Sequence, residues 1–272
     1  MLTPSIELPL YGKRILVTAP RNYASRLSEA IIKQGGLPLL MPTIETSILK
    51  DYAELDAVLK QIDEFDWIAF TSRNGINAFF QRLNVLGIPI SALQKCQLSA
   101  IGKDAELLST LAGRVDIIPA ESSPLGIVTE LSKIIDINNQ KILVPVPEVT
   151  GIPEPNVVPD FIADLQRLGM QVTRVPTYIT RCLDKNIYAV ELNLLRQGMI
   201  DVIAFSSTAE IESFLTMINS KSDYQNSIVA CFGPYTAANA EKLSVDVSIL
   251  SQDYSSFMGF ADAIAQFFQQ QP

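Results

Sequence analysis

Small polar residues and glycines follow four apolar segments of the sequence, and each group precedes a segment whose apolar residues have helical spacing. The residues in these groups are Thr71, Ser72, Gly102, Ser206, Ser207, Thr208 and Gly233. A helix N-terminus offers free backbone N–H groups and the positive end of the helix dipole, and a hydroxyl adds another donor. These positions therefore suit an anionic ligand, although each serine or threonine can also be an ordinary helix N-cap.

The four groups belong to an internal repeat. Five blocks of sequence recur in the same order and at nearly the same spacing, which is typical of two structurally similar units. The pairs are Arg14–Pro20 with Lys141–Pro147, Gly35–Thr43 with Gly169–Thr177, Asp66–Ser72 with Asp201–Ser207, Ala100–Gly102 with Cys231–Gly233, and Ser122–Gly126 with Ser255–Gly259. Because ligands bind outside the carboxyl ends of parallel strands, matched polar groups at four strand ends favour one shared anionic ligand.

Apolar runs of strand length alternate with helical segments along the chain. In the first cycle, Arg14–Pro20 is a predicted strand, Leu27–Gln34 lies on a predicted helix, and Leu37–Met41 is the next strand. Continuous rather than alternating apolar strands in this βαβ pattern predict doubly wound parallel sheets covered by helices on both faces. A further short strand is predicted at Asp116–Ile118.

The chain has 272 residues, of which 48% are hydrophobic and 18% charged. This length suits two domains of about 130 residues, each with its own core. No apolar run approaches the ~20 residues of a membrane span, and Met1–Leu10 lacks the pattern of a secretory signal, so we expect neither. Three widely separated cysteines, Cys96, Cys182 and Cys231, suit buried thiols in a reducing cytoplasm better than a disulfide framework.

The sequence contains no histidine. It therefore lacks the side chain most used in acid–base catalysis near neutral pH, and the cysteines have no CxxC spacing, so no metal site is predicted. The formal net charge is −8 and the lysines and arginines form no cluster, so nucleic acid is not an expected partner. Neither a GxGxxG nor a GxxxxGK[ST] motif is present at the first strand, which argues against a nucleotide-dependent enzyme.

Five short motifs, in order and at matching intervals, resemble those of the uroporphyrinogen-III synthase family, and the likeness covers about Gly12–Phe267. The motifs are Phe70–Arg73, Ile101–Lys103, Val175–Thr180, Phe205–Thr208 and Phe232–Ala237. One stretch departs from the family pattern. After Ile142–Val144 many members carry an Arg-Gly turn, whereas this chain has no arginine in Pro145–Pro155, which puts any contact made by that arginine in doubt.

The resemblance implies two similar doubly wound α/β domains joined by a two-stranded extended linker, with a ligand cleft between the domains. The implied ranges are 1–42 plus 184–272 for the first domain, 49–175 for the second, and 43–48 and 176–183 for the linker strands. Both linkers are rich in β-branched residues and follow or begin with equivalent prolines, Pro42 and Pro176. Spacing alone would instead divide the chain into halves at 1–137 and 138–272.

The activity that the resemblance implies is a lyase reaction of tetrapyrrole and porphyrin biosynthesis. The family's substrate is hydroxymethylbilane, a linear tetrapyrrole with acetate and propionate arms. It loses its terminal hydroxyl as water and closes with one pyrrole ring inverted, giving uroporphyrinogen III. No cofactor is expected, because the electron-rich pyrrole expels the hydroxyl itself. A monomer is the state expected for the family. The expected location is the cytoplasm, because no secretory signal is recognised, and no nucleic-acid or membrane partner is expected from the charge and the apolar runs.

Tyr178 occupies the family's tyrosine position and is the predicted catalytic residue, either as a proton donor or as a group that positions the hydroxyl. The residues expected to bind the substrate are Thr71, Ser72, Arg73, Gly102, Lys103, Ser206, Ser207, Thr208, Gly233, Pro234 and Thr236. Arg21 is a further cation that could approach the carboxylates. Structural roles stay open, with Tyr178 packing the linker and the cations solvated at the surface. A hinged two-domain binding protein, which would return its ligand unchanged, is the alternative function.

Overall fold

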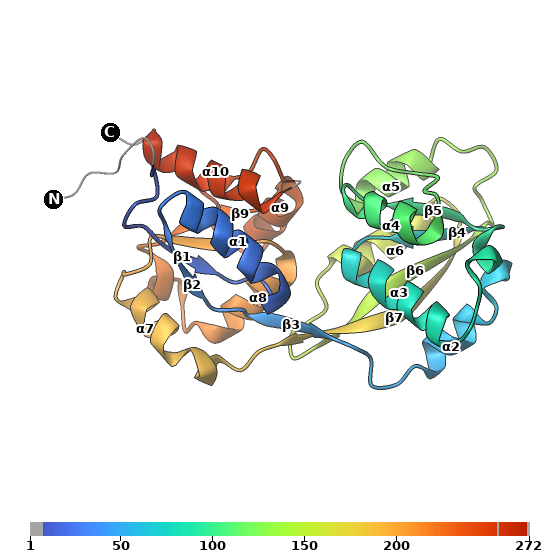
Figure 1. The fold of residues 1–272 in the computed structure, drawn as a ribbon, viewed down its shortest axis with the longest axis horizontal. Helices are drawn as coiled ribbons and strands as arrows, with labels where there is room; N and C mark the ends of the chain where they lie inside the picture. The colour runs from blue at the N-terminus through green and yellow to red at the C-terminus, as the bar shows by residue number, and fades with distance from the viewer. Residues whose placement is uncertain (1–7, 255, 271–272) are drawn as a thin grey trace. The chain divides into compact units, whose positions relative to one another are not determined.

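The computed structural model describes residues 8–254 and 256–270, and within them the chain divides into two compact units (Figure 1). Ser255 of the recurring serine block and the outermost residues of the first predicted domain lie outside the described residues. Unit 1 consists of three segments: the residues up to Glu45, the short stretch Gly151–Pro153, and the residues from Arg181 onward. Unit 2 consists of two segments, Thr46–Thr150 and Glu154–Thr180. The two units are therefore interleaved along the chain rather than being successive halves.

Unit 1 is built on a five-stranded sheet with the strand order β10-β9-β8-β1-β2, and every neighbouring pair in it runs parallel. The strands are β1 (Arg14–Val17), β2 (Leu37–Leu40), β8 (Val202–Phe205), β9 (Ile228–Cys231) and β10 (Ile249–Leu250). Phe205 lies opposite Cys231 in the register, so β8 and β9 end side by side.

Helices cover both faces of the unit 1 sheet. The helices are α1 (Arg21–Lys33), α7 (Ala189–Arg196), α8 (Thr208–Met217), α9 (Pro234–Lys242) and α10 (Phe257–Gln269), with 3₁₀ turns η3 (Lys185–Tyr188) and η4 (Lys221–Tyr224). Along β1, Ile15 and Val17 pack with α1 and α10, which lie side by side in Figure 1, whereas Leu16 packs with α7 and α8 on the other face. Both faces of the strand are buried, which explains its continuous apolar sequence.

Unit 2 is built on a second five-stranded sheet, with the order β3-β7-β6-β4-β5. The strands are β3 (Ile44–Ser47), β4 (Trp67–Phe70), β5 (Gln97–Ala100), β6 (Lys141–Thr150) and β7 (Gln171–Cys182). β4 runs parallel to both of its neighbours, β5 and β6. Most of the predicted linker segment 176–183 belongs to β7, and β6 continues as a strand to Thr150.

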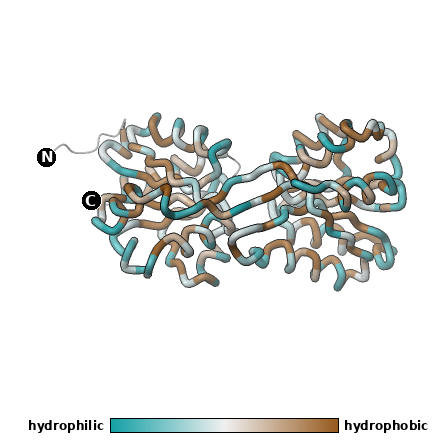
Figure 2. Tube along the Cα trace, turned by 90° about the horizontal axis from the view of Figure 1, so that it is seen from below, coloured by the Kyte–Doolittle hydropathy of each residue, from teal (hydrophilic) through white to brown (hydrophobic). Residues whose placement is uncertain are grey.

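The unit 2 sheet is also covered on both faces. The helices are α2 (Ala53–Leu59), α3 (Arg73–Val85), α4 (Asp104–Ala112), α5 (Pro124–Leu131) and α6 (Val157–Arg167), with 3₁₀ turns η1 (Ile62–Glu64) and η2 (Ile90–Leu93). α2, α3 and α4 share one core with Phe70, and α5 and α6 share the other with Trp67. Figure 2 shows that hydrophobic segments are distributed along the chain in both units. The prediction of two doubly wound parallel-sheet domains is confirmed.

The two sheets follow the same plan. In unit 1 the order β9-β8-β1-β2 matches β5-β4-β6-β7 in unit 2, and the matched strands carry the recurring sequence blocks. Unit 2 adds β3 at one edge, and in the place of β10 it has only a single bridge between Ser99 and Ile117. The strand predicted at Asp116–Ile118 is thus reduced to one bridge, because Pro119 follows it and has no N–H to extend the ladder.

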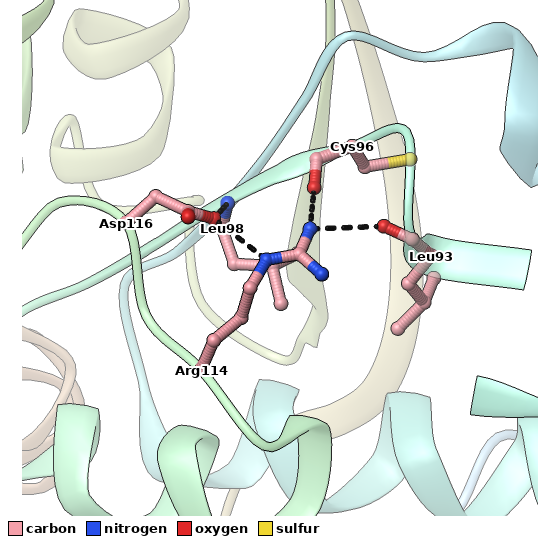
Figure 3. A network of polar contacts seen from close by, with 5 residues as sticks. All are labelled: Leu93, Cys96, Leu98, Arg114 and Asp116. Carbon is pink, nitrogen blue, oxygen red and sulfur yellow. Dashed lines mark hydrogen bonds and ion pairs between the residues drawn. The ribbon is translucent and has the colours of Figure 1, made fainter. Parts of the chain in front are cut away.

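Arg114 fixes the beginning of β5 (Figure 3). Its guanidinium donates to the carbonyl oxygens of Leu93, at 3.1 Å, and Cys96, and its Nε donates to Asp116 at 3.2 Å. Asp116 in turn accepts the backbone N–H of Leu98 at 2.7 Å. These bonds hold the strand from which the Gly102 turn emerges.

Candidate functional site

The predicted site residues of unit 2 lie at the carboxyl ends of two adjacent strands. Phe70 of β4 is opposite Ala100 of β5, so the turns that follow them leave the sheet at the same edge. The first turn contains Thr71, Ser72 and Arg73, and the second contains Gly102 and Lys103. This edge is where open parallel sheets bind their ligands.

Ser72 connects the first turn to Tyr178. It is the N-cap of α3, and its Oγ accepts the backbone N–H of Gly75 at 3.1 Å. The same Oγ lies 3.1 Å from the hydroxyl of Tyr178 on β7, and either group can be the donor. The side chain of Tyr178 is only 9% exposed. A predicted catalytic residue and a predicted substrate-binding residue are therefore in direct contact.

Arg73 joins the two turns of unit 2. Its Nε donates to Asp104 at 3.0 Å, and its terminal nitrogen lies 3.5 Å from the carbonyl oxygen of Lys103. Burial raises the pKa of the Asp104 carboxyl, and the Arg73 guanidinium opposes that shift. The ion pair is partly exposed and compensates much of the charge of Arg73. Lys103 is exposed and forms no ion pair with any described residue, which makes it the more available cation.

The backbone conformation of the second turn requires a glycine at position 102. Its φ is +50°, in the left-handed region that favours glycine, and a Cβ there would lie 3.1 Å from Ser122 Oγ. Ser123, next to that serine, is the N-cap of α5 and accepts the N–H of Gly126 at 3.0 Å. A serine N-cap that accepts the N–H of a glycine three residues later thus begins α5, and Ser256 and Gly259 form the same N-cap at the start of α10.

The matching turn of unit 1 is occupied by a side chain of the protein. Glu210, in the first turn of α8, is 1% exposed. Its carboxyl oxygens accept from the hydroxyl and the backbone N–H of Ser206, the latter at 2.9 Å, and from Ser207 Oγ at 3.0 Å. The hydroxyl of Thr18 lies 2.8 Å from the same carboxyl group. The two serine hydroxyls predicted to bind substrate are therefore already engaged.

Glu210 has features of a carboxyl group that retains its proton. Burial raises the pKa of Glu210, and the hydrogen bonds from Ser206, Thr18 and Ser207 oppose the shift. The hydroxyl of Thr18 lies 2.8 Å from both Glu210 Oε2 and the carbonyl oxygen of Ala204, yet it has one proton to give. A protonated Glu210 can donate to Thr18 and leave the Thr18 proton for Ala204.

Other predicted residues of unit 1 lie at the same edge of its sheet. Thr208 is the first residue of α8, and Gly233 is the N-cap of α9 with Pro234 at its first position. A Cβ at Gly233 would approach the Cβ of Tyr254 to 3.2 Å, so the glycine allows close packing. Thr236 is buried in the first turn of α9.

Arg21 begins α1 and is exposed. Burial raises the pKa of Tyr188, and the nearby guanidinium of Arg21 opposes the shift. Arg21 therefore lies near Tyr188 of unit 1.

Glu210 is the residue that sequence reasoning missed. The available signal was the spacing of Ser207 and Glu210, a serine followed three residues later by glutamate at a helix start, which is the pattern of a capping box.

Metal-binding and membrane-spanning features are absent from the described ranges. No group of three or more histidine, cysteine, aspartate or glutamate side chains there could hold a metal ion. No helix in those ranges is long and apolar enough to cross a membrane.

A family model described as uroporphyrinogen-III synthase HemD matches residues 25–257. The chain belongs to this family. The resemblance carried by the five sequence motifs is confirmed, and so is the activity that the family implies, that of a hydro-lyase in tetrapyrrole biosynthesis. The individual site residues stay predictions.

Relatives of the family match the chain over nearly its whole length. The uroporphyrinogen-III synthase of Synechococcus elongatus is 28% identical over 262 residues, covering 92% of this chain and 93% of that protein. The corresponding protein of Chlorobaculum parvum is 23% identical and covers 93% of this chain and 98% of its own. A crystal structure of a mutant uroporphyrinogen III synthase from Thermus thermophilus has a TM-score of 0.71 at 16% identity, covering 95% of this chain and 100% of that chain. The structural match concerns the fold alone.

Proposed function

We propose that this chain converts hydroxymethylbilane into uroporphyrinogen III and that Tyr178 assists the departure of the terminal hydroxyl. The observation that carries the proposal is the contact between Ser72 and Tyr178, at the carboxyl end of the unit 2 sheet. A phenol held there lies beside helix N-termini that suit the carboxylate arms of the substrate. A proton donor and anion-binding positions are thus combined at one edge.

The reaction needs one proton at the departing oxygen. The pyrrole ring supplies electrons that break the bond between carbon and hydroxyl, and a proton from Tyr178 lets the hydroxyl leave as water. For the ring inversion, the methylene carbon that lost the hydroxyl first bonds to the terminal pyrrole at the α-carbon already joined to the chain. The older bond at that α-carbon then breaks, and the freed chain carbon bonds to the other α-carbon, which loses its proton to restore the aromaticity of the ring. A phenol is a weak acid, so its contribution is modest, and Ser72 fixes its hydroxyl in place.

Carboxylate arms of the substrate are held, in this proposal, at the two turns of unit 2. Thr71 and the N-terminus of α3 provide one set of donors, and Lys103 at the start of α4 provides a cation. Each helix N-terminus contributes about 0.3–1 kcal/mol to an anion, more where water is excluded. Arg73 orients the two turns through Asp104 more than it attracts the substrate, because its charge is already compensated.

Unit 1 offers substrate fewer hydroxyl donors. The family resemblance predicts that Ser206 and Ser207 bind the substrate. To bind a carboxylate through their side chains, both hydroxyls must first break their hydrogen bonds with Glu210. Thr208 and the backbone at Gly233, Pro234 and Thr236 are the remaining candidates there. We propose that Thr208, Gly233 and Thr236 bind mainly through backbone N–H groups at the starts of α8 and α9, and that Pro234, which has no N–H, fixes the backbone there.

A coupled assay tests the function. Hydroxymethylbilane generated in situ closes to isomer I when no enzyme directs it, so the oxidised products are separated chromatographically into uroporphyrin I and III. Addition of this protein is expected to shift the product to isomer III, and heat-denatured protein serves as the control. Only isomer I in the presence of folded protein would contradict the proposal.

We also propose that the protein works as a monomer in the cytoplasm. The three cysteines are free thiols, and burial raises the pKa of Cys96 to about 11 and that of Cys231 to about 12, which makes both unreactive. This use of cysteine suits a reducing compartment. Light scattering coupled to size exclusion is expected to give the mass of one chain, and a concentration-independent dimer would contradict the monomer.

A further inference from the structure

Tyr178 also lines a hollow of about 260 Å³ in unit 2, and the proposed chemistry uses none of the other lining residues. All of its lining residues belong to unit 2. One wall is a single face of α3, where Asn74, Asn77 and Gln81 recur at the spacing of neighbouring helical turns. The lining also includes Thr46 and Ser47, the last two residues of β3. The hollow therefore runs along α3, away from the Ser72 turn.

Two amide side chains in this wall are available to a ligand. Asn77 and Gln81 are exposed, and neither side chain forms a hydrogen bond with another described residue. Each amide has two N–H donors and a carbonyl acceptor, so it can bind a carboxylate or the N–H of a pyrrole. The regular helix α3 fixes the spacing of the two side chains along the wall.

The charged residue in the hollow is already paired. Arg82 donates from two nitrogens to the two oxygens of Asp56, both at 2.6 Å, and its guanidinium lies 4.0 Å from the centre of the Tyr52 ring. This bidentate pair lowers the pKa of Asp56 through its hydrogen bonds with Arg82. The pair of Arg82 and Asp56 has little net charge. An acid arm in the hollow would therefore be bound by the amides of Asn77 and Gln81.

The rim of the hollow is apolar. Ile48 is 70% exposed and Val85 is 63% exposed, and both line the hollow. Exposed apolar side chains next to neutral hydrogen-bonding groups fit a flat ring that carries polar arms. The volume is below the roughly 300–1,000 Å³ that encloses a drug-sized ligand, so the hollow accommodates a part of a large molecule.

We propose that this hollow is a subsite for one pyrrole ring of the linear tetrapyrrole, with Asn77 and Gln81 binding its acid arm. This inference rests on the proposed function. It extends the substrate site from the turn of Ser72 along α3, and it assigns substrate binding to two residues that no sequence motif includes.

The first test compares Michaelis constants in the coupled assay. Asn77→Ala and Gln81→Ala are each expected to raise KM for hydroxymethylbilane, and the double variant to raise it ~10-fold, with kcat nearly unchanged. Asn84→Ala is the matched control, because Asn84 is an exposed amide on the same helix outside the hollow. An unchanged KM in the double variant, in an enzyme that makes isomer III, would overturn the subsite.

A second test identifies the acid arm and separates the subsite from the activity. Gln81→Glu is expected to raise KM more than Gln81→Ala does, because the new carboxylate would face the carboxylate of the substrate. A KM of Gln81→Glu at or below the wild-type value would contradict the claim that Gln81 binds an acid arm. Calorimetric binding of uroporphyrin III to the same proteins does not depend on turnover. A further outcome is that the wild type forms no isomer III while the double variant still binds uroporphyrin III more weakly than the wild type does. That result would support the subsite and refute the proposed function. Equal binding would overturn the subsite.

Discussion

The turns that follow β4 in unit 2 and β8 in unit 1 have the same construction and different contents. Both begin after a buried phenylalanine and use a serine as N-cap, Ser72 and Ser207. Three residues into the helix, unit 2 has Gly75 and unit 1 has Glu210. In unit 1 the carboxyl group fills the turn, whereas in unit 2 the serine contacts Tyr178. The third residue of the helix, Gly75 or Glu210, therefore determines whether the donors of the turn bind a side chain of the protein or are available to a ligand.

The second turns differ in the same sense. Lys103 follows Gly102 in unit 2, and Pro234 follows Gly233 in unit 1. The first places a cation at the edge of the sheet, and the second fixes the backbone at a helix start. In both pairs, unit 2 has the residue that suits a charged ligand and unit 1 has the residue that stabilises its own helix.

The largest expected effect comes from emptying the turn of unit 1. Glu210→Ala leaves the hydroxyls of Ser206 and Ser207 without their acceptor, removes a hydrogen-bond partner of Thr18 and opens a cavity, so it should lower the free energy of unfolding by about 3 kcal/mol. Urea denaturation measures the change. Glu241→Ala, an exposed glutamate in the same unit, serves as the control. A loss no larger than in that control would show that the carboxyl group does not hold the turn.

Filling the turn of unit 2 tests the other side of the comparison. Gly75→Glu places a carboxylate beside Ser72, where it competes with the substrate arms, and kcat/KM should fall ~100-fold. The fold should survive, because glutamate at this helix position completes a capping box. Asn84→Glu adds the same charge to the same helix away from the turn. Equal activities of the two variants would mean that the turn does not receive the substrate.

Removal of the Lys103 charge should have a smaller effect. Lys103→Ala is expected to raise KM up to ~5-fold, as for loss of an exposed charge pair, and to weaken the salt dependence of KM. Lys60→Ala, on the exposed end of α2, is the control for net charge. A salt dependence that is the same in both variants would exclude Lys103 from substrate binding.

The smallest expected effect is a pH dependence of stability. Because the folded-state pKa of Glu210 is raised above its ordinary value of 4.5, its contribution is fully present below that value and is lost as pH rises through the folded pKa. The stability of the wild type should therefore fall relative to Glu210→Gln as pH rises above 4.5. Urea midpoints at a series of pH values measure the difference. A difference that is constant with pH would show that Glu210 does not retain its proton.

The sequence predicted the sheets and the strand-end turns well, because both depend on local patterns. Continuous apolar runs such as Val202–Phe205 identify buried strands, and the repeat of Asp66–Ser72 predicts a second matched unit. Spacing alone could not give the interleaved segments of the two units. The pairing of β1 with β8, more than 180 residues apart, depends on tertiary contacts that a repeat does not encode.

The contents of the turns could not be predicted. A glutamate on a helix is usually solvated, and Glu210 is buried because Thr18, distant in sequence, packs over it. The contact of Ser72 with Tyr178 likewise joins two segments 106 positions apart. The hollow along α3 involves Asn77 and Gln81, whose residue types alone indicate an ordinary exposed helix face.

The contact between Ser72 and Tyr178 gives the most direct test of the account. The rate of isomer III formation is measured for Tyr178→Phe and for Tyr224→Phe, which removes a hydroxyl from a buried tyrosine of unit 1. The account predicts a loss of about 10-fold in kcat for Tyr178→Phe and no change for Tyr224→Phe. The expected loss is smaller than is usual for one acid–base group, because a phenol is a weak acid and the substrate expels its own leaving group. An unchanged kcat in a folded Tyr178→Phe variant would contradict the assignment of the chemistry to unit 2.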